Sequence, residues 1–588
     1  MFKILKHLTL KQWIFFIIAG LMIVGQVFIE LQLPEYMEKI TNTLQAGGAT
    51  SEILKNGGIM LACALAGGII SVLVGLISAK IGAKLSQTLR SKVYGKVNSF
   101  SPAEMHKFSV ASLITRSTND ITQVQRTIST GFQVIIKAPT MAILSICKIA
   151  SKSWQWSFST GVAILILLIS TLIIISLCLP KFKIIQKQTD DLNRITRENL
   201  TGLRVIKAFN AENYEQGKFD NINTDLTKTN VFTHSVLSFF QPIMYVVIDA
   251  LSISIYVIGA LLISRAGDVA TKAQLFSDTM VFFSYAMMVI SSFMMLIMIF
   301  MILPRAQVCA KRIQEVLDTN SSILDGAGVT PTEKGTIKFN DVSFGYQDAK
   351  EPVLRNISFD VKQGESVAII GSTGSGKSTL VKLIPRLYDV TSGEVFVDGE
   401  NVKDYKLSEL YDRIGYISQK AMLFSGTIES NIAMGNISGK KVDTKDVENA
   451  IKQSQSSAFV ENLNGTYKAE VYQQGSNFSG GQKQRISIAR ALARKPEILI
   501  FDDSFSALDY QTDKNLRQTL KKEFADTTTI IIAQRVGTIK NCDKILVLDN
   551  GQIVASGTHK ELLNNSPLYK EIALSQLSKE ELEKDETK

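Results

Sequence analysis

Six long apolar runs lie in the part of the chain that ends at Leu303, and no run of comparable length follows them. A helix of about 20 residues crosses about 30 Å of hydrocarbon, so each run is long enough to span a bilayer. The expected spans are Trp13–Leu33, Gly57–Ala79, Val134–Ala150, Ser157–Leu179, Phe239–Ile263 and Met280–Leu303. The third is the weakest, because it is short and contains Lys137 and Lys148. The first is too long for the apolar core of a signal peptide, so we expect it to be retained as a span.

The basic residues of the chain cluster around these apolar runs. The formal net charge of +10 would also fit nucleic-acid binding, but Lys and Arg gather before the first run and in the long segments between runs two and three and between runs four and five. Positive residues favour the cytoplasmic side, so both termini are expected there, with the basic loops facing anionic lipid. The two long segments contain few helix breakers, so the membrane helices are expected to continue well into the cytoplasm. We therefore expect a multi-pass protein of the cell membrane that contacts the lipid bilayer and no nucleic acid.

The cysteines and histidines indicate neither a disulfide framework nor a metal site. The five cysteines are widely spaced, form no C-x-x-C pattern, and three of them lie inside apolar runs. The four histidines form no ligand cluster. A structural metal site is not expected.

After Leu303 short β-rich runs alternate with helical stretches, and one junction between them carries a phosphate-binding motif. The apolar strand Ser366–Ile370 leads directly into a sequence that fits GxxxxGK[ST]. Glycines let backbone N–H groups wrap around phosphates, Lys377 reaches the terminal phosphates, and the Ser378 hydroxyl can ligate Mg²⁺. The expected nucleotide-binding residues are Gly371, Ser372, Thr373, Gly374, Ser375, Gly376, Lys377, Ser378 and Thr379.

A second apolar strand, Ile498–Asp502, ends in a carboxylate, which is the form of a Walker B segment. In such segments the terminal aspartate holds Mg²⁺, so Asp502 is expected to do this through the water shell of the ion. Strand, phosphate loop and terminal aspartate together predict a P-loop NTPase.

Between these two motifs lies Phe478-Ser-Gly-Gly-Gln482, which resembles the signature sequence of the ATP-binding cassette (ABC) proteins. Tyr346, Tyr416-Ile-Ser-Gln419 and Ser506-Ala-Leu-Asp509 follow the order of that family, and residues 113–120 and 202–210 resemble the membrane half of ABC exporters. The resemblance implies an α-helical membrane domain, with six transmembrane helices and long cytoplasmic extensions, fused to an α/β P-loop cassette. The implied boundaries are 1–310 for the membrane domain, 311–335 for a linker, 336–570 for the cassette and 571–588 for a charged tail.

The resemblance also implies roles outside the phosphate loop. Tyr346 would stack on adenine, and Gln419 would touch Mg²⁺ and relay the nucleotide state to the membrane helices. Ser479, Gly480 and Gly481, with Gln482 completing the motif, would bind the γ-phosphate of an ATP held by a partner cassette. Coupling helices near Pro102–Phe108 and Phe209–Tyr214 would dock on the cassettes. The implied cofactors are ATP and Mg²⁺, the latter held by Ser378, Gln419 and Asp502.

Three positions depart from the family pattern. Asp503 stands where the family has glutamate as the general base, and its shorter side chain is not expected to reach the attacking water, a change that costs about 10²–10⁴-fold in rate. Gln534 replaces the usual histidine, and although its amide can donate to the γ-phosphate, it cannot become cationic. Gln473 and Gln474 replace the usual Glu-Arg pair before the signature. Asp503 and Gln534 are therefore predicted to be degenerate catalytic positions, with weak hydrolysis at this chain's own site.

The intact phosphate loop, Walker B aspartate and signature argue against an inactive protein. The pattern instead resembles the degenerate subunit of heterodimeric bacterial multidrug exporters, in which one ATP stays bound while a different half-transporter hydrolyses the other. The expected function is ATP-driven efflux of hydrophobic or cationic drugs and other small molecules across the cytoplasmic membrane. A homodimer, a flippase for lipids or lipid-like compounds, and a largely regulatory ATP-binding subunit are the alternatives.

Two features of the spans bear on the cargo. Five methionines fall on one helical stripe of the sixth run, with Met288 and Met295 beside it; they are Met280, Met287, Met294, Met298 and Met301. Flexible, polarizable methionines suit many apolar shapes, but helix packing or lipid contact also accounts for such a stripe. Asp249 lies inside the fifth run, and an intramembrane carboxylate either serves a site, here for a cationic compound, or pairs with a polar group on a neighbouring helix.

Overall fold

The computed structural model describes residues 2–150, 154–346, 349–434, 436–437 and 440–577. The chain divides into two compact units. The first comprises Met1–Lys96 and Ala111–Thr319, and the second comprises Val97–Val110 and Asn320–Lys588. Most of the predicted charged tail, residues 578–588, lies outside the described residues.

The first unit is built from long helices. Their bounds are α1 (Phe2–Leu5), α2 (Leu10–Gln45), α3 (Thr50–Asn98), α5 (Val110–Ser117), α6 (Asn119–Arg126), the π-helical turn η1 (Thr127–Gly131), α7 (Phe132–Ala150), α8 (Trp154–Thr201), α9 (Leu203–Ala208), α10 (Glu212–Ser238), α11 (Phe240–Arg265) and α12 (Val269–Asp318). Within the described residues, six helical segments are long and apolar enough to cross a membrane. This confirms the six predicted spans.

The helices are much longer than a bilayer requires. At 1.5 Å per residue, the 50 residues of α12 extend over about 75 Å, more than twice the roughly 30 Å of hydrocarbon. Helix α8 (48 residues) and helix α3 (49 residues) are similar. The surplus length confirms the predicted helical extensions beyond the membrane.

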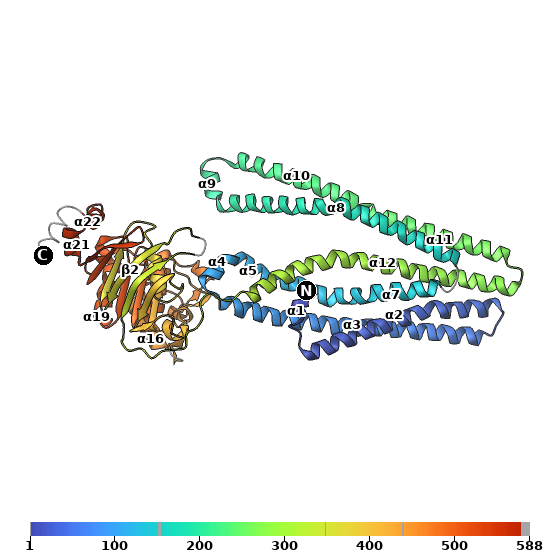
Figure 1. Cartoon of the computed structure of the whole chain (residues 1–588), viewed down its shortest axis with the longest axis horizontal. Coiled ribbons are helices and arrows are strands. Elements are labelled where there is room, and N and C mark those ends of the chain that lie inside the picture. The colour runs from blue at the N-terminus through green and yellow to red at the C-terminus, as the bar shows by residue number, and fades with distance from the viewer. Residues whose placement is uncertain (1, 151–153, 347–348, 435, 438–439, 578–588) are drawn as a thin grey trace. The chain divides into compact units, whose positions relative to one another are not determined.

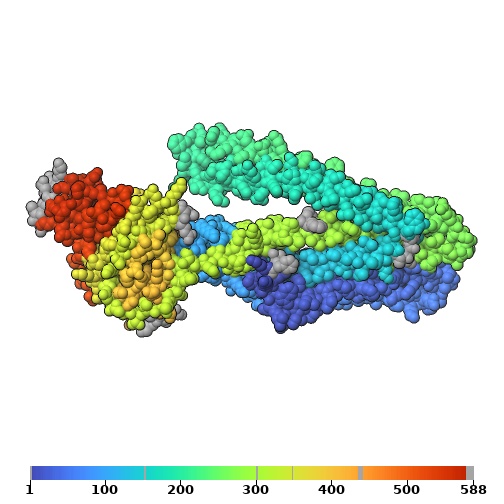
Figure 2. Space-filling model, viewed as in Figure 1, coloured from blue at the N-terminus to red at the C-terminus, as the bar shows by residue number. Residues whose placement is uncertain are grey.

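Within this unit the helices form two groups that meet along α11. Helix α12 packs along α7 and α2, and α8 packs along α10 and α11 (Figure 1). The buried indole of Trp156 donates to the Ile255 carbonyl at 3.2 Å and joins α8 to α11. The space-filling view shows the arm formed by α8 and α10 standing apart from the stalk of α12 (Figure 2). That arm therefore presents long helical surfaces that this unit does not cover.

The lysines that weaken the third span are both paired with glutamates of α2. Lys137 Nζ donates to Glu30 Oε1 at 2.7 Å, and Gln26 donates to the same oxygen at 2.8 Å. Lys148 forms an ion pair with Glu35. Charged groups are tolerated in a bilayer when they are paired. The apparent interruption of the third span is thus a pair of links between α2 and α7.

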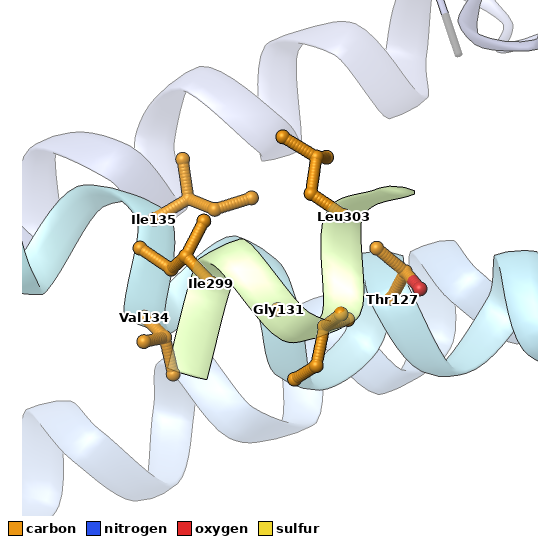
Figure 3. A pocket seen from close by; sticks show the side chains of 7 residues that line it. Thr127, Gly131, Val134, Ile135, Ile299 and Leu303 are labelled. Carbon is orange, nitrogen blue, oxygen red and sulfur yellow. The ribbon is translucent and has the colours of Figure 1, made fainter. Parts of the chain in front are cut away.

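The third span contains a second irregularity, the π-helical turn η1. Figure 3 shows an apolar pocket where this turn faces α12, lined by Thr127, Gly131, Val134, Ile135, Ile299, Ile302 and Leu303. Pro304 follows directly in α12 and has no N–H to complete the helical hydrogen bond. Single π turns and prolines are the usual causes of helix kinks. The two irregularities therefore lie close together on facing helices.

The second unit contains two β-sheets. As far as the chain is described, the larger has the strand order β14-β13-β3-β12-β11-β6 and the smaller β2-β1-β4-β5. The strands are β1 (Ile337–Phe344), β2 (Leu354–Val361), β3 (Ser366–Ile370), β4 (Ser392–Val397), β5 (Glu400–Asn401), β6 (Ile414–Ile417), β11 (Ile498–Asp502), β12 (Thr528–Ile532), β13 (Lys544–Asp549) and β14 (Gln552–Gly557). Strands β6, β11, β12, β3 and β13 are parallel, and β14 is antiparallel. Ligands bind beyond the carboxyl ends of such parallel strands.

The main helices of this unit cover the sheets or form a separate helical layer. They are α13 (Lys377–Leu383), α14 (Leu407–Arg413), α15 (Ile428–Ile432), α16 (Thr444–Gln453), α18 (Gly480–Leu492), α19 (Tyr510–Glu523), α20 (Val536–Ile539), α21 (His559–Asn565) and α22 (Pro567–Leu574). Side chains of α13 pack in one apolar core with β1, β2 and β4, whereas those of α16 and α18 pack in a second core. Strand β11 is buried along its whole length and contributes to both.

A short helix from the first half of the sequence belongs to this second unit. Helix α4 (Pro102–Phe108) begins with a capping box in which Ser101 and Glu104 bond to each other. The Glu104 carboxylate also accepts the backbone N–H of Ser322 at 3.1 Å. The segment 97–110, which contains one of the two predicted coupling helices, is thus bonded to the start of the cassette chain.

Candidate nucleotide site

The phosphate loop connects β3 to α13. Its first and last glycines occupy positions where a side chain would clash or strain the backbone. A Cβ atom at Gly371 would collide with the Leu548 carbonyl oxygen, and Gly376 has φ 100°, where side chains are strained. The loop closes on itself through a hydrogen bond from Ser375 N to Ser372 O at 3.2 Å. The sequence therefore folds here into a tight cradle of backbone N–H groups, as the motif predicts.

Lys377 places its ammonium group inside this cradle. Its Nζ donates to the Gly371 carbonyl at 2.9 Å and to the Ser372 carbonyl at 2.7 Å. Burial lowers the pKa of Lys377, and the nearby Asp503 carboxylate partly opposes this. A half-buried cation at the centre of a loop of N–H donors is suited to terminal phosphates.

Asp502 is held at the end of β11 by two hydroxyl groups. Ser378 Oγ donates to Asp502 Oδ1 at 2.6 Å, and Tyr416 donates its phenolic hydrogen to Oδ2 at 2.8 Å. Two of the predicted Mg²⁺ ligands, Ser378 and Asp502, are therefore adjacent. Oxygen donors of this kind fit Mg²⁺, which prefers carboxylates, hydroxyls and water.

Tyr416 was not predicted as a site residue. Burial and the Asp502 charge raise its pKa, so the hydroxyl remains a donor. The sequence signal was present, because Tyr416 lies in the predicted segment that ends at Gln419. In the structure it is the last residue but one of β6, the strand next to β11. A tyrosine on a neighbouring parallel strand has the reach to meet a carboxylate at the same sheet edge.

Asp503 is fixed between two amides. Gln419 Nε2 donates to Asp503 Oδ2 at 3.0 Å, and Gln534 Nε2 donates to the same oxygen at 2.9 Å. The backbone of Asp503 is left-handed, with φ 50°. Burial raises the pKa of the Asp503 carboxyl above its ordinary value, although the two amide donors act in the opposite direction. We call Gln419, Asp503 and Gln534 the amide clamp.

The amide clamp gives two predicted site residues a contact that the sequence did not predict. Gln534 Nε2, the predicted donor to a γ-phosphate, donates one hydrogen bond to Asp503 Oδ2, and the amide has a second N–H for a phosphate oxygen. Gln419 turns its N–H toward Asp503, which leaves its amide oxygen as the atom suited to Mg²⁺.

Tyr346 lies next to the phosphate loop. Its hydroxyl forms a hydrogen bond of 3.0 Å with the Thr379 hydroxyl, and its ring packs edge-on against Tyr388 and Phe344. These contacts hold the ring in one orientation. The structure therefore places the predicted adenine-stacking aromatic at the start of α13.

The signature residues begin a helix that packs in the second core. Ser479 caps α18, and its capping box with Gln482 includes the Ser479 N–H to Gln482 Oε1 bond of 2.9 Å. Ser479 and Gly480 are exposed, and a Cβ at Gly480 would meet nothing within 4 Å. An exposed helix start with bare backbone can approach another molecule closely.

Comparison with known proteins agrees with both halves of the chain. The ABC transporter family model matches residues 354–506, and the model of the ABC transporter transmembrane region matches residues 16–284. An uncharacterized ABC transporter ATP-binding protein of Mycobacterium tuberculosis is 35% identical over 549 residues, which cover 93% of each chain. The chain belongs to the ABC transporter family and is a half-transporter, with one membrane domain fused to one ATP-binding domain.

Other relatives carry functional names. A putative multidrug export ATP-binding/permease protein of Staphylococcus aureus is 32% identical over 83% of each chain. An ATP-dependent lipid A-core flippase of Mannheimia succiniciproducens is 29% identical over 86% of this chain and 85% of its own. A solved structure of a bacterial Atm1-family ABC exporter with ATP bound has a TM-score of 0.77, covers 97% of this chain and 98% of its own, and is 23% identical. The fold is that of an ABC exporter.

Proposed function

We propose that this chain is the degenerate half of a heterodimeric ABC exporter, whose own site binds ATP and Mg²⁺ but hydrolyses slowly. The observation that carries the proposal is the amide clamp, in which one oxygen of Asp503 accepts two N–H donors. These two bonds fix the carboxylate on its short side chain, so the group cannot advance toward an attacking water without breaking them. A positioned general base is worth about 10²–10⁴-fold in rate, so its loss is enough to make one site slow.

The remaining parts of the site support tight nucleotide binding. The phosphate loop and Lys377 bind the phosphates, Tyr346 stacks on the base, and Ser378, Asp502 and the Gln419 oxygen hold Mg²⁺. The metal neutralises phosphate charge when it is bound. Gln534 is a neutral amide and cannot accept a proton and become cationic as a histidine does. The site is therefore equipped to hold ATP and poorly equipped to cleave it.

The exposed signature indicates a second cassette. Ser479, Gly480 and Gly481 are intact and would close on ATP held by the partner, so hydrolysis there depends on this chain. The other predicted coupling segment, at the turn between α9 and α10, exposes 78% of Phe209 and 73% of Tyr214. Large exposed aromatics at the tip of an uncovered arm are suited to docking on a second subunit. We place the cassette and both termini in the cytoplasm because the basic residues surround the inner ends of the spans.

The test is the ATPase rate of the full-length transporter in lipid nanodiscs. Two preparations are compared, one purified through a tag on this chain from the native membrane and one of this chain expressed alone. We expect substrate-stimulated hydrolysis from the first and little from the second. In the native preparation Asp503→Asn should leave the rate nearly unchanged. Strong hydrolysis by this chain alone that Asp503→Asn abolishes would show that Asp503 is a working base and overturn the proposal.

The cargo we propose is a hydrophobic or cationic small molecule, exported across the cytoplasmic membrane. A lipid flippase is the second candidate, because one relative named above is a lipid A-core flippase. Proteoliposomes that contain a fluorescent phospholipid and an apolar dye separate these candidates. ATP-dependent movement of the dye with an unchanged lipid distribution supports efflux, and the reverse result supports a flippase. ATP binding without movement of either compound would instead identify a regulatory subunit.

A further inference from the structure

Helix α11 presents three different faces. One is buried against α8 and α12 and consists of Met244, Val247, Leu251, Ile255 and Gly259. A second face, on the far side, is apolar and exposed, with Val246, Ile253 and Val257 each more than half exposed. This second face suits lipid, because exposed aliphatic side chains carry no cost in hydrocarbon.

The third face lies between these two and is polar. At 100° per residue, Gln241, Tyr245, Asp249, Ser252 and Tyr256 fall within about 80° of one another. Gln241 Nε2 donates to the Tyr245 hydroxyl at 3.5 Å, and Tyr245 and Tyr256 are 58% and 48% exposed. We call this face the polar stripe of α11. Such a stripe is not suited to lipid, so it faces water, a bound molecule or a partner subunit.

Asp249 at the centre of the stripe differs from the acidic residues of α2. Glu30 and Glu35 each pair with a lysine of α7. Among the described residues, Asp249 is exposed and has neither a hydrogen-bonding nor an ion-pair partner for its carboxylate. An unpaired carboxylate within a span is costly and marks a functional site.

The methionine stripe of α12 lies next to the polar stripe. Tyr256 stacks on Phe283 of α12 with ring centroids 5.7 Å apart and an interplanar angle of 28°. Phe283 shares its helix face with Met280, Met287 and Met294. Together these four residues follow one another at spacings of three, four and seven, and the methionines are partly exposed or exposed. The side chain of the predicted fifth member, Met301, lies outside the described residues.

The packing of α11 against α12 shows which residues of α12 lie at the same height along the helix pair as Asp249. Besides the Tyr256–Phe283 stack, Met244 and Met294 line one small cavity, so α11 and α12 run antiparallel past each other. Counting along both helices puts Asp249 within about one turn of the levels of Met287 and Met294. A carboxylate, two tyrosines and a row of methionines therefore border one seam.

We propose that this seam binds the cargo and that the cargo is a lipophilic organic cation, an inference that rests on the proposed export function. Asp249 supplies the counter-charge, the faces of Tyr245 and Tyr256 attract a cation, and Met287 and Met294 adapt to its apolar groups. Water-filled space beside the seam would keep Asp249 solvated when no cargo is bound.

The test compares a cation with a neutral compound of similar shape, tetraphenylphosphonium and triphenylphosphine oxide. The transporter is purified from native membranes through a tag on this chain, and ATP-dependent uptake is measured in inverted vesicles. Asp249→Asn should raise the half-saturating concentration of tetraphenylphosphonium at least about tenfold, the effect of losing a desolvated charge pair, and leave that of triphenylphosphine oxide unchanged. Asp249→Glu should restore most of the affinity. The matched control is Asp225→Asn, at an exposed position of α10 outside the apolar part of the helix.

Each other outcome contradicts the inference in a different way. Equal effects of Asp249→Asn on both compounds, or no effect on either, would show that Asp249 does not recognise charge. Loss of the dimer in mass photometry would assign Asp249 to the contact with the partner subunit. Transport of the neutral compound but not the cation by the wild-type protein would overturn this inference and leave the export function standing. No ATP-dependent movement of either compound would contradict both.

Discussion

The two halves of the molecule use charged residues in different ways. In the cassette, ionisable side chains meet at one sheet edge, where Lys377 at the start of α13, Asp502 at the end of β11 and the adjacent Asp503 belong to recognisable motifs. In the membrane unit, the charges lie on long helices without any motif, and the pairs Glu30–Lys137 and Glu35–Lys148 join α2 to α7. The phosphate-binding and Mg²⁺-binding residues of the cassette thus lie in recognisable local motifs, whereas the role of a charge in the membrane unit depends on the helix packed beside it.

The two halves also differ in how residues that break the expected pattern behave. In the cassette, a departure from the motif, Asp503, creates a new local arrangement with Gln419 and Gln534. In the membrane unit, a charged residue inside a span is accommodated where an oppositely charged residue pairs with it. Asp249 has no such partner among the described residues.

The largest effect is expected from restoring the base and its companion together. Asp503→Glu with Gln534→His should raise hydrolysis at this chain's own site by about 10²–10⁴-fold, because a longer carboxylate regains reach and the second amide is removed. Asp503→Glu alone should give a smaller gain, since Gln534 can still bind the new carboxylate. The measurement is ATPase activity of this chain expressed alone. Equal rates for the single and double variants would mean that Gln534 does not restrain the base.

A middle-sized effect is expected in the membrane unit. Lys137→Met leaves the Glu30 carboxylate without its ion pair and should destabilise the protein by about 1–3 kcal/mol, less than for a fully buried pair because both side chains are 23% exposed. Exchanging the charges, with Glu30→Lys and Lys137→Glu, should recover most of that loss. Thermal unfolding in nanodiscs measures both, with Lys55→Met at an exposed site of α3 as the control. If the exchange is no better than Lys137→Met, the pair does not stabilise the contact between α2 and α7.

The smallest effect is expected where α4 joins the cassette chain. Burial opposes the charge of Glu104, but bonds from Ser101 and Ser322 outweigh this and lower the pKa of its carboxyl. A lowered folded-state pKa means stability that is present above the unfolded value of about 4.3 and is lost as the pH falls through the folded value. Glu104→Gln should therefore weaken the attachment of α4 by about 1–2 kcal/mol at neutral pH.

Hydrogen exchange of residues 97–110 measures that attachment. Faster exchange in Glu104→Gln than in the wild type at pH 7 is expected, and the difference should disappear under acid conditions below the lowered pKa. The control is Glu212→Gln at the other predicted coupling segment, which should leave exchange of 97–110 unchanged. A difference that persists in acid would show that the Glu104 charge is not what holds α4.

Much of the fold and the site could be predicted because the information is local. Six apolar runs predicted six spans, and the strand-to-loop transition at Gly371 placed the phosphate site without any knowledge of distant residues. The ends of the helices were harder to predict from the sequence. The first span was predicted to end at Leu33, but α2 continues through Pro34 to Gln45, since only one backbone bond is lost at a proline.

The rest depends on contacts between residues far apart in sequence. Glu30 and Lys137 are separated by 107 positions, so neither residue alone reveals that the third span is intact. Gln419 and Gln534 lie 84 and 31 positions from Asp503. The sequence showed that the base was shortened, but only the fold shows that two amides hold it.

In the proposed mechanism this chain's own site holds ATP without cleaving it while the transporter turns over. The direct measurement is photolabelling of the native complex during turnover with azido-ATP that carries its label on either the α- or the γ-phosphate, followed by separation of the subunits. This chain is expected to retain both labels equally, whereas the partner retains the α label and loses the γ label. Loss of the γ label from this chain at the partner's rate would contradict the proposed mechanism.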